Sequence, residues 1–255
     1  MSVSFGTPHR HYRVIDSTSE RARELVEAGA PGGTVVTARA QTAGRGRRGR
    51  VWTAPEGKAL LYSAILRPLD ERHLLLPLSV PLAVCTAAEE LRPGIECQVK
   101  WPNDIWLEER KLSGILIEAR PQDGWAVIGI GLNLSIEPHE FPDNLRHPAV
   151  SLFGAGKETR GGSRRSLPAV APPGPPPRLP TAAAVLSRHL DRWVYAEQDE
   201  ILEEWRRRDG LRGREIGWED GSGVAGGIDD RGNLVVALDG GGRVNLGAGE
   251  VQIRL

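Results

Sequence analysis

The first half of the chain alternates short runs that predict strands with longer segments that predict helices. Residues 16–29 (DSTSERARELVEAG) predict a helix, because Ser17 and Glu20 have the spacing of a capping box and Gly29 supplies a stop. In the next segments, β-branched residues favour strands, and a long apolar run that ends in Pro-Gly favours a buried helix. They are predicted strands at residues 34–40 and 59–68 and a predicted buried helix at residues 76–94.

Further strand signals follow, and two of them form a hairpin. Residues 104–108 pair with residues 111–119, and the turn is predicted at Glu109 and Arg110. The order of strands and helices lacks the regular βα rhythm of a doubly wound fold. We therefore predict an α+β fold, with a mixed, largely antiparallel sheet and flanking helices. The remaining strands of this region are predicted at residues 96–101 and 125–135.

The composition changes abruptly between residues 154 and 180. Seven prolines lie between Pro168 and Pro180, after a patch rich in Gly, Ser and Arg. This composition predicts a disordered insertion. Its first residues, GAGKET, imitate a phosphate-binding loop, but Ser151 and Glu158 stand where that motif requires Gly and Ser or Thr.

The last third of the chain predicts a helical segment and then a small second domain. In residues 182–210, apolar side chains recur at the three- and four-residue spacing of a helix. After Gly210, five short strand signals separated by Gly and Asp predict a small SH3-like β-barrel. The predicted domains are 1–209, which includes the insertion at 154–180, and 210–255.

Composition excludes several classes of protein. The 33 Lys and Arg residues equal the 33 Asp and Glu residues, so no global positive field gathers nucleic acid. The longest apolar stretch is interrupted by Pro77 and Pro81, and the N-terminus carries no signal-peptide pattern. The spacing of Cys85 and Cys97 fits neither a metal knuckle nor a redox motif. We expect a soluble, cytoplasmic protein.

The predicted strand VIGIGLNL has one packed face and one emptied face. Ile128, Ile130 and Leu132 fall on one side of the strand, while Gly129 and Gly131 fall on the other. Glycine inside a strand is costly, and it often marks the close approach of a ligand or of another backbone. The alternative is that the glycines accommodate a bulky neighbour in the core.

The segments WPND and KLSGILIE bring polar groups toward the same sheet. Strict alternation puts Lys111 on the face opposite Gly114, at the start of an otherwise apolar strand. Pro102 favours an extended residue before it, so Asn103 and Asp104 follow next to the hairpin that carries Lys111. The alternatives are a lysine that only reaches solvent at a strand end and a simple Asx turn.

The segment QTAGRGRRGRVW packs four arginines and three glycines between Gly44 and Arg50 and follows a strand as a long loop. Each close pair of like charges costs on the order of a few kcal/mol at an effective dielectric near 20, so we expect a mobile loop without a ligand. An anion with several oxygens reverses this balance, because guanidinium groups bind phosphate bidentately. A solvated basic loop and a nucleic-acid patch are the alternatives.

These motifs together resemble the biotin protein ligases. The segments DSTS, QTAGRGRRGRVW, VKWPNDIW, RKLSGILIE and GIGLNLS occur in the order and at about the spacing of that family, across residues 13–153. The resemblance extends to GVAGGIDDRGNLVV in the tail and leaves the proline-rich insertion unmatched. It implies a catalytic domain like that of biotin ligases and class II aminoacyl-tRNA synthetases.

The resemblance implies a two-step reaction. The carboxylate of biotin attacks the α-phosphate of Mg-ATP, and a lysine amine of a biotin carboxyl carrier protein then attacks the activated acyl group. The ureido ring would be bound by Ser17, Thr18 and Gln41 with nearby backbone groups. The full set of implied biotin-binding residues is Ser17, Thr18, Ser19, Gln41, Gly44, Arg45, Gly46, Arg47, Lys111, Gly114, Gly129 and Gly131.

For the nucleotide, the resemblance implies that Lys111 and Arg47 offset the charge of the reacting phosphate and that Trp52 stacks on adenine. Asp104 would orient the incoming lysine or accept its proton, which makes Lys111, Arg47 and Asp104 the implied catalytic residues. ATP and Mg²⁺ would be co-substrates, with no permanent cofactor and no dedicated metal site assigned. The implied ATP-binding residues are Arg45, Arg47, Arg48, Trp52, Asn103, Lys111 and Asn133.

Two departures and two rivals accompany this interpretation. Ser19 stands where the family commonly has Asn, and only fifteen residues precede DST, so we expect no N-terminal DNA-binding domain. A lipoate or octanoate ligase is the nearest rival, and a nucleic-acid-binding module that uses the arginine loop is a rival of another class. We expect biotin, ATP and a carrier protein as partners, no nucleic acid or membrane, and a monomer or homodimer.

Overall fold

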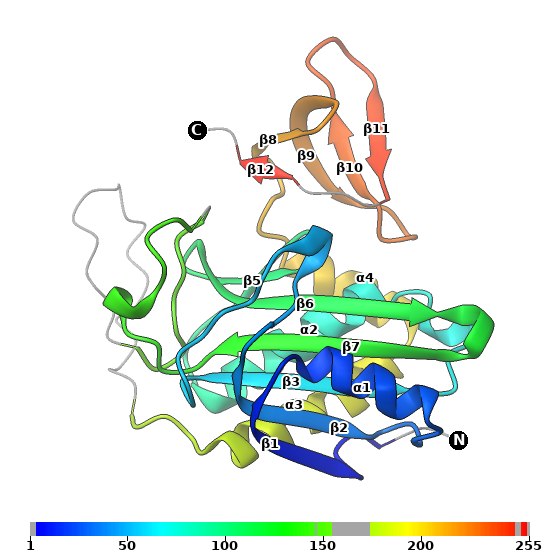
Figure 1. Ribbon diagram of the computed structural model, residues 1–255. Coiled ribbons are helices and arrows are strands. Elements are labelled where there is room, and N and C mark those ends of the chain that lie inside the picture. The colour runs from blue at the N-terminus through cyan, green and yellow to red at the C-terminus, as the bar shows by residue number, and fades with distance from the viewer. Residues whose placement is uncertain (1–3, 146, 155–173, 248–250, 254–255) are drawn as a thin grey trace.

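A computed structural model describes residues 4–145, 147–154, 174–247 and 251–253. These residues form a seven-stranded sheet flanked by helices and a five-stranded sheet near the C-terminus (Figure 1). The strands of the larger sheet are β1 His9–Ile15, β2 Val35–Gln41, β3 Ala59–Leu66, β4 Gln98–Lys100, β5 Asp104–Leu107, β6 Arg110–Arg120 and β7 Trp125–Asn133.

The larger sheet has the strand order β1-β2-β3-β7-β6-β5-β4. β1 and β2 pair in parallel, and the other neighbouring strands pair antiparallel. Each strand from β2 to β7 lies where the hydrophobic pattern predicts it, so the prediction of a mixed, largely antiparallel sheet is confirmed.

The sequence analysis missed β1. Its residues HRHYRVI are mostly exposed, and Ile15 is its buried member. An edge strand has only one neighbour in its sheet, and this one covers little of the core. It therefore lacks the alternation of buried and exposed residues by which strands are recognised.

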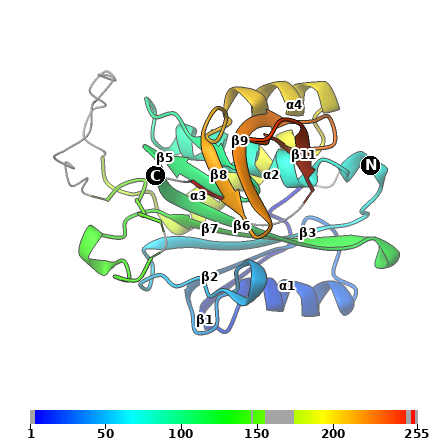
Figure 2. The same ribbon diagram turned by 90° about the horizontal axis from the view of Figure 1, so that it is seen from above.

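The helices cover the two faces of the sheet unequally. Figure 2 shows α1 (Thr18–Glu27) on one face and α2 (Leu76–Leu91), α3 (Leu179–Val194) and α4 (Gln198–Arg207) on the other. The Ser17 hydroxyl accepts a hydrogen bond from the Glu20 amide and so caps α1, as predicted, but the second bond of a capping box is replaced, because the Ser17 amide donates to Asp16 Oδ1. The face that carries only α1 leaves part of the sheet for a binding site.

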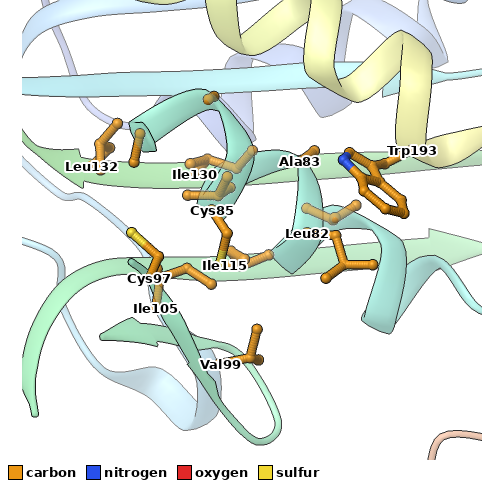
Figure 3. Close-up of a cluster of buried hydrophobic side chains, with 14 of the residues drawn as sticks. Leu82, Ala83, Cys85, Cys97, Val99, Ile105, Ile115, Ile130, Leu132 and Trp193 are labelled. Carbon is orange, nitrogen blue, oxygen red and sulfur yellow. The ribbon is translucent and has the colours of Figure 1, made fainter. Parts of the chain in front are cut away.

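The main core lies between the sheet and the helices α2 and α3. Figure 3 shows Ile115 and Ile130 from the sheet beside Leu82 of α2 and Trp193 of α3. Cys85 and Cys97 lie in the same core as free thiols. A hydrogen bond with the Cys85 thiol and burial raise the pKa of Cys97 well above its usual value, so this thiol stays neutral.

The turn of the β5–β6 hairpin was predicted one residue too late. The turn residues are Glu108 and Glu109, both with positive φ, and Arg110 already pairs with Leu107. Two-residue turns with positive φ favour Asn and Gly, so two glutamates gave no signal of the turn position.

The helical segment after the insertion also differs from its prediction. It forms two helices, α3 and α4, and α3 begins at Leu179, inside the range predicted as insertion. Pro180 occupies the first turn of α3, where the missing N–H of proline costs no hydrogen bond. Residues 155–173 of the predicted insertion lie outside the described residues.

The smaller sheet has the order β11-β10-β9-β8-β12, and all its pairs are antiparallel. All five strands lie where short strand signals predict them. The described residues contain no ladder between β11 and β12, so closure into an SH3-like barrel stays a prediction. The strands are β8 Glu215–Trp218, β9 Gly221–Ile228, β10 Leu234–Ala237, β11 Arg243–Leu246 and β12 Gln252–Ile253.

The segment that connects α4 to β8 pairs with the edge strand β4. The Val99 amide donates to the Arg208 carbonyl, and the Gly210 amide donates back to the Val99 carbonyl. The Trp101 indole N–H donates to the Gly232 carbonyl at 3.1 Å. Within the part of the chain that is described, no helix is long and apolar enough to cross a membrane.

Candidate active site

A cavity of about 400 Å³ lies where α1 begins, on the face of the large sheet that α1 covers. The arginine loop and described residues after β7, within 141–145 and 147–149, complete its walls. Most of the predicted site residues meet here although they come from five separate segments. The predicted residues in its walls are Thr18, Ser19, Gln41, Arg45, Gly46, Arg47, Trp52, Asn103, Asp104, Lys111, Gly114, Gly129, Gly131 and Asn133.

Three predicted residues do not line the cavity. Ser17 caps α1 from a buried position. Gly44 is buried, and a Cβ on it would overlap the Trp52 carbonyl and lie 2.6 Å from Gln41 Nε2. Arg48 adopts φ 53° at the tip of the arginine loop. Ser17 and Gly44 therefore support the wall, and Arg48 is outside it.

The glycines of β7 make room for side chains of the site itself. A Cβ on Gly131 would overlap the Trp52 indole, and a Cβ on Gly129 would overlap the Ser19 hydroxyl. Neither a ligand nor a core residue therefore occupies the space over the two glycines, because Trp52 and Ser19 lie directly on the strand. Both side chains line the cavity, so the emptied face does build the site.

A β-bulge brings Lys111 to the face that carries Gly114. Trp106 pairs with Lys111 and Ile105 pairs with Ser113, so Leu112 is the extra residue of β6. Leu112 is fully buried in the core, and a Cβ on Gly114 would approach Lys111 Nζ at 3.3 Å. Strict alternation, which puts these two residues on opposite faces, is therefore wrong at this position.

Lys111 carries a positive charge into the cavity wall. Its Nζ lies 2.6 Å from Asp104 Oδ1 and 5.7 Å from the centroid of the Trp52 ring. The Asp104 carboxylate and the face of the Trp52 ring both attract the Lys111 ammonium group electrostatically. The Lys111 ammonium thus has the Asp104 carboxylate as its partner when no ligand is bound, and it can also attract a negatively charged reactant in the cavity.

Two predicted asparagines are held by the backbone. Asn103 Nδ2 donates to the Ile115 carbonyl at 2.9 Å, and its Oδ1 accepts from Arg47 at 3.0 Å. Asn133 Nδ2 donates to the Val150 carbonyl at 3.1 Å and to the Lys111 carbonyl at 3.4 Å. Each amide is fixed in orientation, and Asn103 also positions the guanidinium of Arg47 beside the cavity.

The arginine loop is held by acidic side chains that the sequence analysis did not single out. Arg45 donates to both oxygens of Glu118 on β6, at 2.8 and 3.1 Å, and to Glu20 in the first turn of α1 at 3.0 Å. These bonds hold one end of the loop to two elements across the cavity. The two carboxylates offset part of the repulsion between the arginines. They can therefore hold the loop in place when no ligand is bound.

Sequence reasoning missed the acidic pair, a buried serine and one whole wall. After the bulge, Gly114, Leu116 and Glu118 share a face of β6, so correct alternation would have found Glu118. Ser63 on β3 is paired with Gly129 on β7, which only the strand register shows. The wall formed by residues within 141–145 and 147–149 has no regular sequence pattern that could have indicated it.

No group of three or more His, Cys, Asp or Glu residues able to hold a metal ion occurs among the described residues. The cavity thus combines hydroxyl and amide groups near α1 with cationic groups near β5 and β6. This combination suits a ligand with a neutral polar end and an anionic end.

Comparison with known proteins first defines the class. Residues 11–135 match the model of the Biotin/lipoate A/B protein ligase family. The chain is 32% identical to the biotin–[acetyl-CoA-carboxylase] ligase of Mycobacterium tuberculosis, over 98% of this chain and 91% of that protein. The chain therefore belongs to the biotin–protein ligase family.

Other relatives agree with this assignment. The bifunctional ligase/repressor BirA of Bacillus subtilis is 41% identical over 58% of this chain, and the match spans about half of that relative (47%). The biotin protein ligase of Aquifex aeolicus, solved in complex with biotin and ATP, superposes with a TM-score of 0.72 at 28% identity. That superposition covers 98% of this chain and 99% of the other. The predictions of family and of fold class are confirmed.

The ion pairs of Arg45 yield a prediction about the loop. Glu118→Gln removes the charged acceptor of two hydrogen bonds, so the loop should open more often. We expect trypsin to cleave after the loop arginines about 3- to 10-fold faster than in the unmodified protein, a range set by charge-assisted bonds at a partly exposed site.

The rates are measured by mass spectrometry of the loop peptides under native conditions. Glu215→Gln, on an exposed position of β8, is the matched control and should leave cleavage unchanged. Equal cleavage of the loop in both variants would contradict a holding role for Glu118.

Proposed function

We propose that this protein is an ATP-dependent biotin ligase. A carboxylate oxygen of biotin attacks the α-phosphorus of ATP, the bond to the β-phosphate breaks, and pyrophosphate leaves. The lysine amine of a carrier protein then attacks the acyl carbon, AMP leaves, and the nitrogen loses a proton. The observation that carries the proposal is one cavity with neutral hydrogen-bonding groups at one end and Lys111 with Arg47 at the other.

The end of the cavity near α1 is proposed to bind the ureido ring of biotin. Thr18 and Gln41 line it, and Ser19 lies beside them on Gly129. A neutral ring needs paired donors and acceptors in a mostly enclosed pocket, because each unmatched buried group costs about 1 to 3 kcal/mol. Gly46 in the arginine loop adds backbone within the same wall, while Ser17 and Gly44 support it.

The cationic end is proposed to bind the nucleotide. Lys111 would offset the charge that builds on the α-phosphate as biotin attacks, and Arg47, held by Asn103, would bind phosphate oxygens. Trp52 is proposed to stack on adenine, and Asn133 to face the phosphates with the Mg²⁺ that accompanies ATP. Arg45 is engaged by carboxylates, so we propose that it holds the loop and does not grip phosphate.

Asp104 is proposed to act in the second step. Its carboxylate contacts Lys111, so it lies close to the atom at which the acyl-phosphate is formed. A carboxylate at that place can orient the ammonium of the acceptor lysine and take the proton that it releases. The arginine loop, held across the cavity, would keep water from the mixed anhydride.

The partners and the division into domains follow from the same proposal. Biotin and ATP are the small-molecule substrates, and a biotin carboxyl carrier protein supplies the acceptor lysine. We propose residues 1–209 as the catalytic domain and residues 210–255 as a second domain. The support for this boundary is that Gly210 begins the segment whose strands pair only with one another within the described residues.

Isotope exchange tests the choice of substrate. Pure protein with ATP, Mg²⁺ and labelled pyrophosphate should incorporate label into ATP when biotin is added, because adenylate formation is reversible. Lipoate and octanoate should give no exchange, since neither carries a ureido group for Thr18 and Gln41. Exchange with lipoate in place of biotin would reject this function.

Lys111 tests the mechanism. Lys111→Ala should lower the rate of adenylate formation at least about 100-fold, because a preorganised charge at the phosphate is lost. Lys58→Ala, which removes an ion pair with Glu140 outside the cavity, should keep near-normal activity. The rates are measured by single turnover, with melting curves to show that both variants fold. A Lys111→Ala protein as active as Lys58→Ala would remove Lys111 from this role.

A further inference from the structure

Ser63 is a fully buried serine beside the cavity whose hydroxyl has no role in the mechanism described so far. It lies on β3, paired with Gly129 of β7, on the face that carries α1. Its neighbour Tyr62 points to the opposite face, where its hydroxyl lies 2.9 Å from the Ser187 hydroxyl. β3 therefore carries a hydroxyl on each face of the sheet, and only that of Ser63 lies beside the cavity wall.

The Ser63 hydroxyl is the middle member of a hydrogen-bonded chain. It lies 3.1 Å from the Ser19 hydroxyl and donates to Thr18 Oγ1 at 2.8 Å. Thr18 Oγ1 in turn donates to Gln41 Oε1 at 3.0 Å. The emptied position at Gly129 is what admits Ser19 to this chain, because a Cβ there would overlap the Ser19 hydroxyl.

The backbone fixes the direction of the chain. The Thr18 amide can only donate, and it donates to Gln41 Oε1 at 2.7 Å, so the oxygen of the Gln41 amide must face Thr18. The Thr18 hydroxyl donates its hydrogen to the same oxygen of Gln41. It can therefore only accept a hydrogen bond from the Ser63 hydroxyl. Ser63 has then used its own proton, and Ser19 must donate to Ser63. The hydrogen bonds therefore all run in one direction, from Ser19 through Ser63 and Thr18 to Gln41.

This polarity determines what Thr18 and Gln41 offer to a ligand. Gln41 Oε1 accepts two hydrogen bonds from Thr18, which turns the NH₂ group of Gln41 away from Thr18 and toward Gly44 as a donor. Thr18 Oγ1 donates one bond and accepts one, so one lone pair of its hydroxyl oxygen is left to accept. Because Thr18 and Gln41 both line the cavity, the hydrogen-bonding capacity that they leave for a ligand is the N–H donors of Gln41 and one acceptor lone pair of Thr18.

We propose that Ser63 is a positioning residue that sets this donor and acceptor pair for a cyclic urea, whose carbonyl accepts beside an N–H that donates. The inference rests on the proposed function and adds to it the residue behind the wall that fixes the recognition pattern. Without Ser63, the Thr18 hydroxyl loses the donor that holds its orientation, and it can turn its acceptor side away from the ligand. A dithiolane ring has no groups to match this pair, so the same chain disfavours lipoate.

The test compares Ser63→Ala with Ser187→Ala. Both substitutions remove one buried serine hydroxyl bonded to another hydroxyl, but Ser187 lies on the opposite face, against Tyr62. Titration calorimetry with biotin and, separately, with ATP gives the dissociation constants, and melting curves give the stability of each variant. Diaminobiotin, which lacks the urea carbonyl, serves as the matched ligand.

We expect Ser63→Ala to weaken biotin binding about 5- to 50-fold and to change ATP binding less than about 2-fold. Ser187→Ala should bind both ligands like the unmodified protein at a comparable loss of melting temperature. The preference for biotin over diaminobiotin should shrink in Ser63→Ala and persist in Ser187→Ala. Ser63→Cys keeps a similar volume but replaces the hydroxyl by a thiol, which is a weaker hydrogen-bond donor. It should weaken biotin binding by a smaller factor than Ser63→Ala. This variant replaces Ser63→Ala in the test if the alanine variant does not fold.

Equal effects of the two alanine variants on biotin, or an unchanged preference over diaminobiotin in Ser63→Ala, would overturn the role of Ser63. In that case the unmodified protein would still bind biotin, and the proposed function would stand. Failure of the unmodified protein to bind biotin would reject the proposed function together with this inference.

Discussion

The site depends on the absence of two Cβ atoms on β7. At Gly129 and Gly131, side chains from α1 and from the arginine loop rest directly on the strand, where any larger residue would displace them. The same contacts attach two separate segments of the chain to one rigid surface. Because Ser19 and Trp52 lie so close to β7, both side chains have fixed positions in the cavity wall.

Electrostatic balance is the second constraint. A loop with four arginines between Gly44 and Arg50 would repel itself, and Glu20 and Glu118 compensate part of that charge through Arg45. Arg47 lies beside the cavity, where its guanidinium donates a hydrogen bond to Asn103 Oδ1. Arg45 therefore holds the loop to β6 and α1, while Arg47 lines the cavity next to Asn103. The resemblance alone assigned both arginines to the biotin site and to the ATP site.

Much of the fold and most of the site were predictable because they rest on local patterns. Alternation located β7, and the cap at Ser17 located α1. Prediction failed where long-range pairing decides the outcome. The bulge at Leu112 moves Lys111 to the face of Gly114, and the register of β3 on β7 puts Ser63 next to Gly129. β1 escaped notice because an exposed edge strand needs no apolar alternation.

Substitution of Gly131 by alanine tests most directly whether the cavity that we propose for the substrates depends on the missing Cβ atoms of β7. The added methyl group would force the Trp52 indole off β7, while Gly226→Ala, in a strand of the smaller sheet, has space for its methyl group. Calorimetric titration with biotin and ATP should give at least about a 10-fold loss of affinity for Gly131→Ala and none for Gly226→Ala, with both proteins folded. Unchanged affinities in Gly131→Ala would contradict the account.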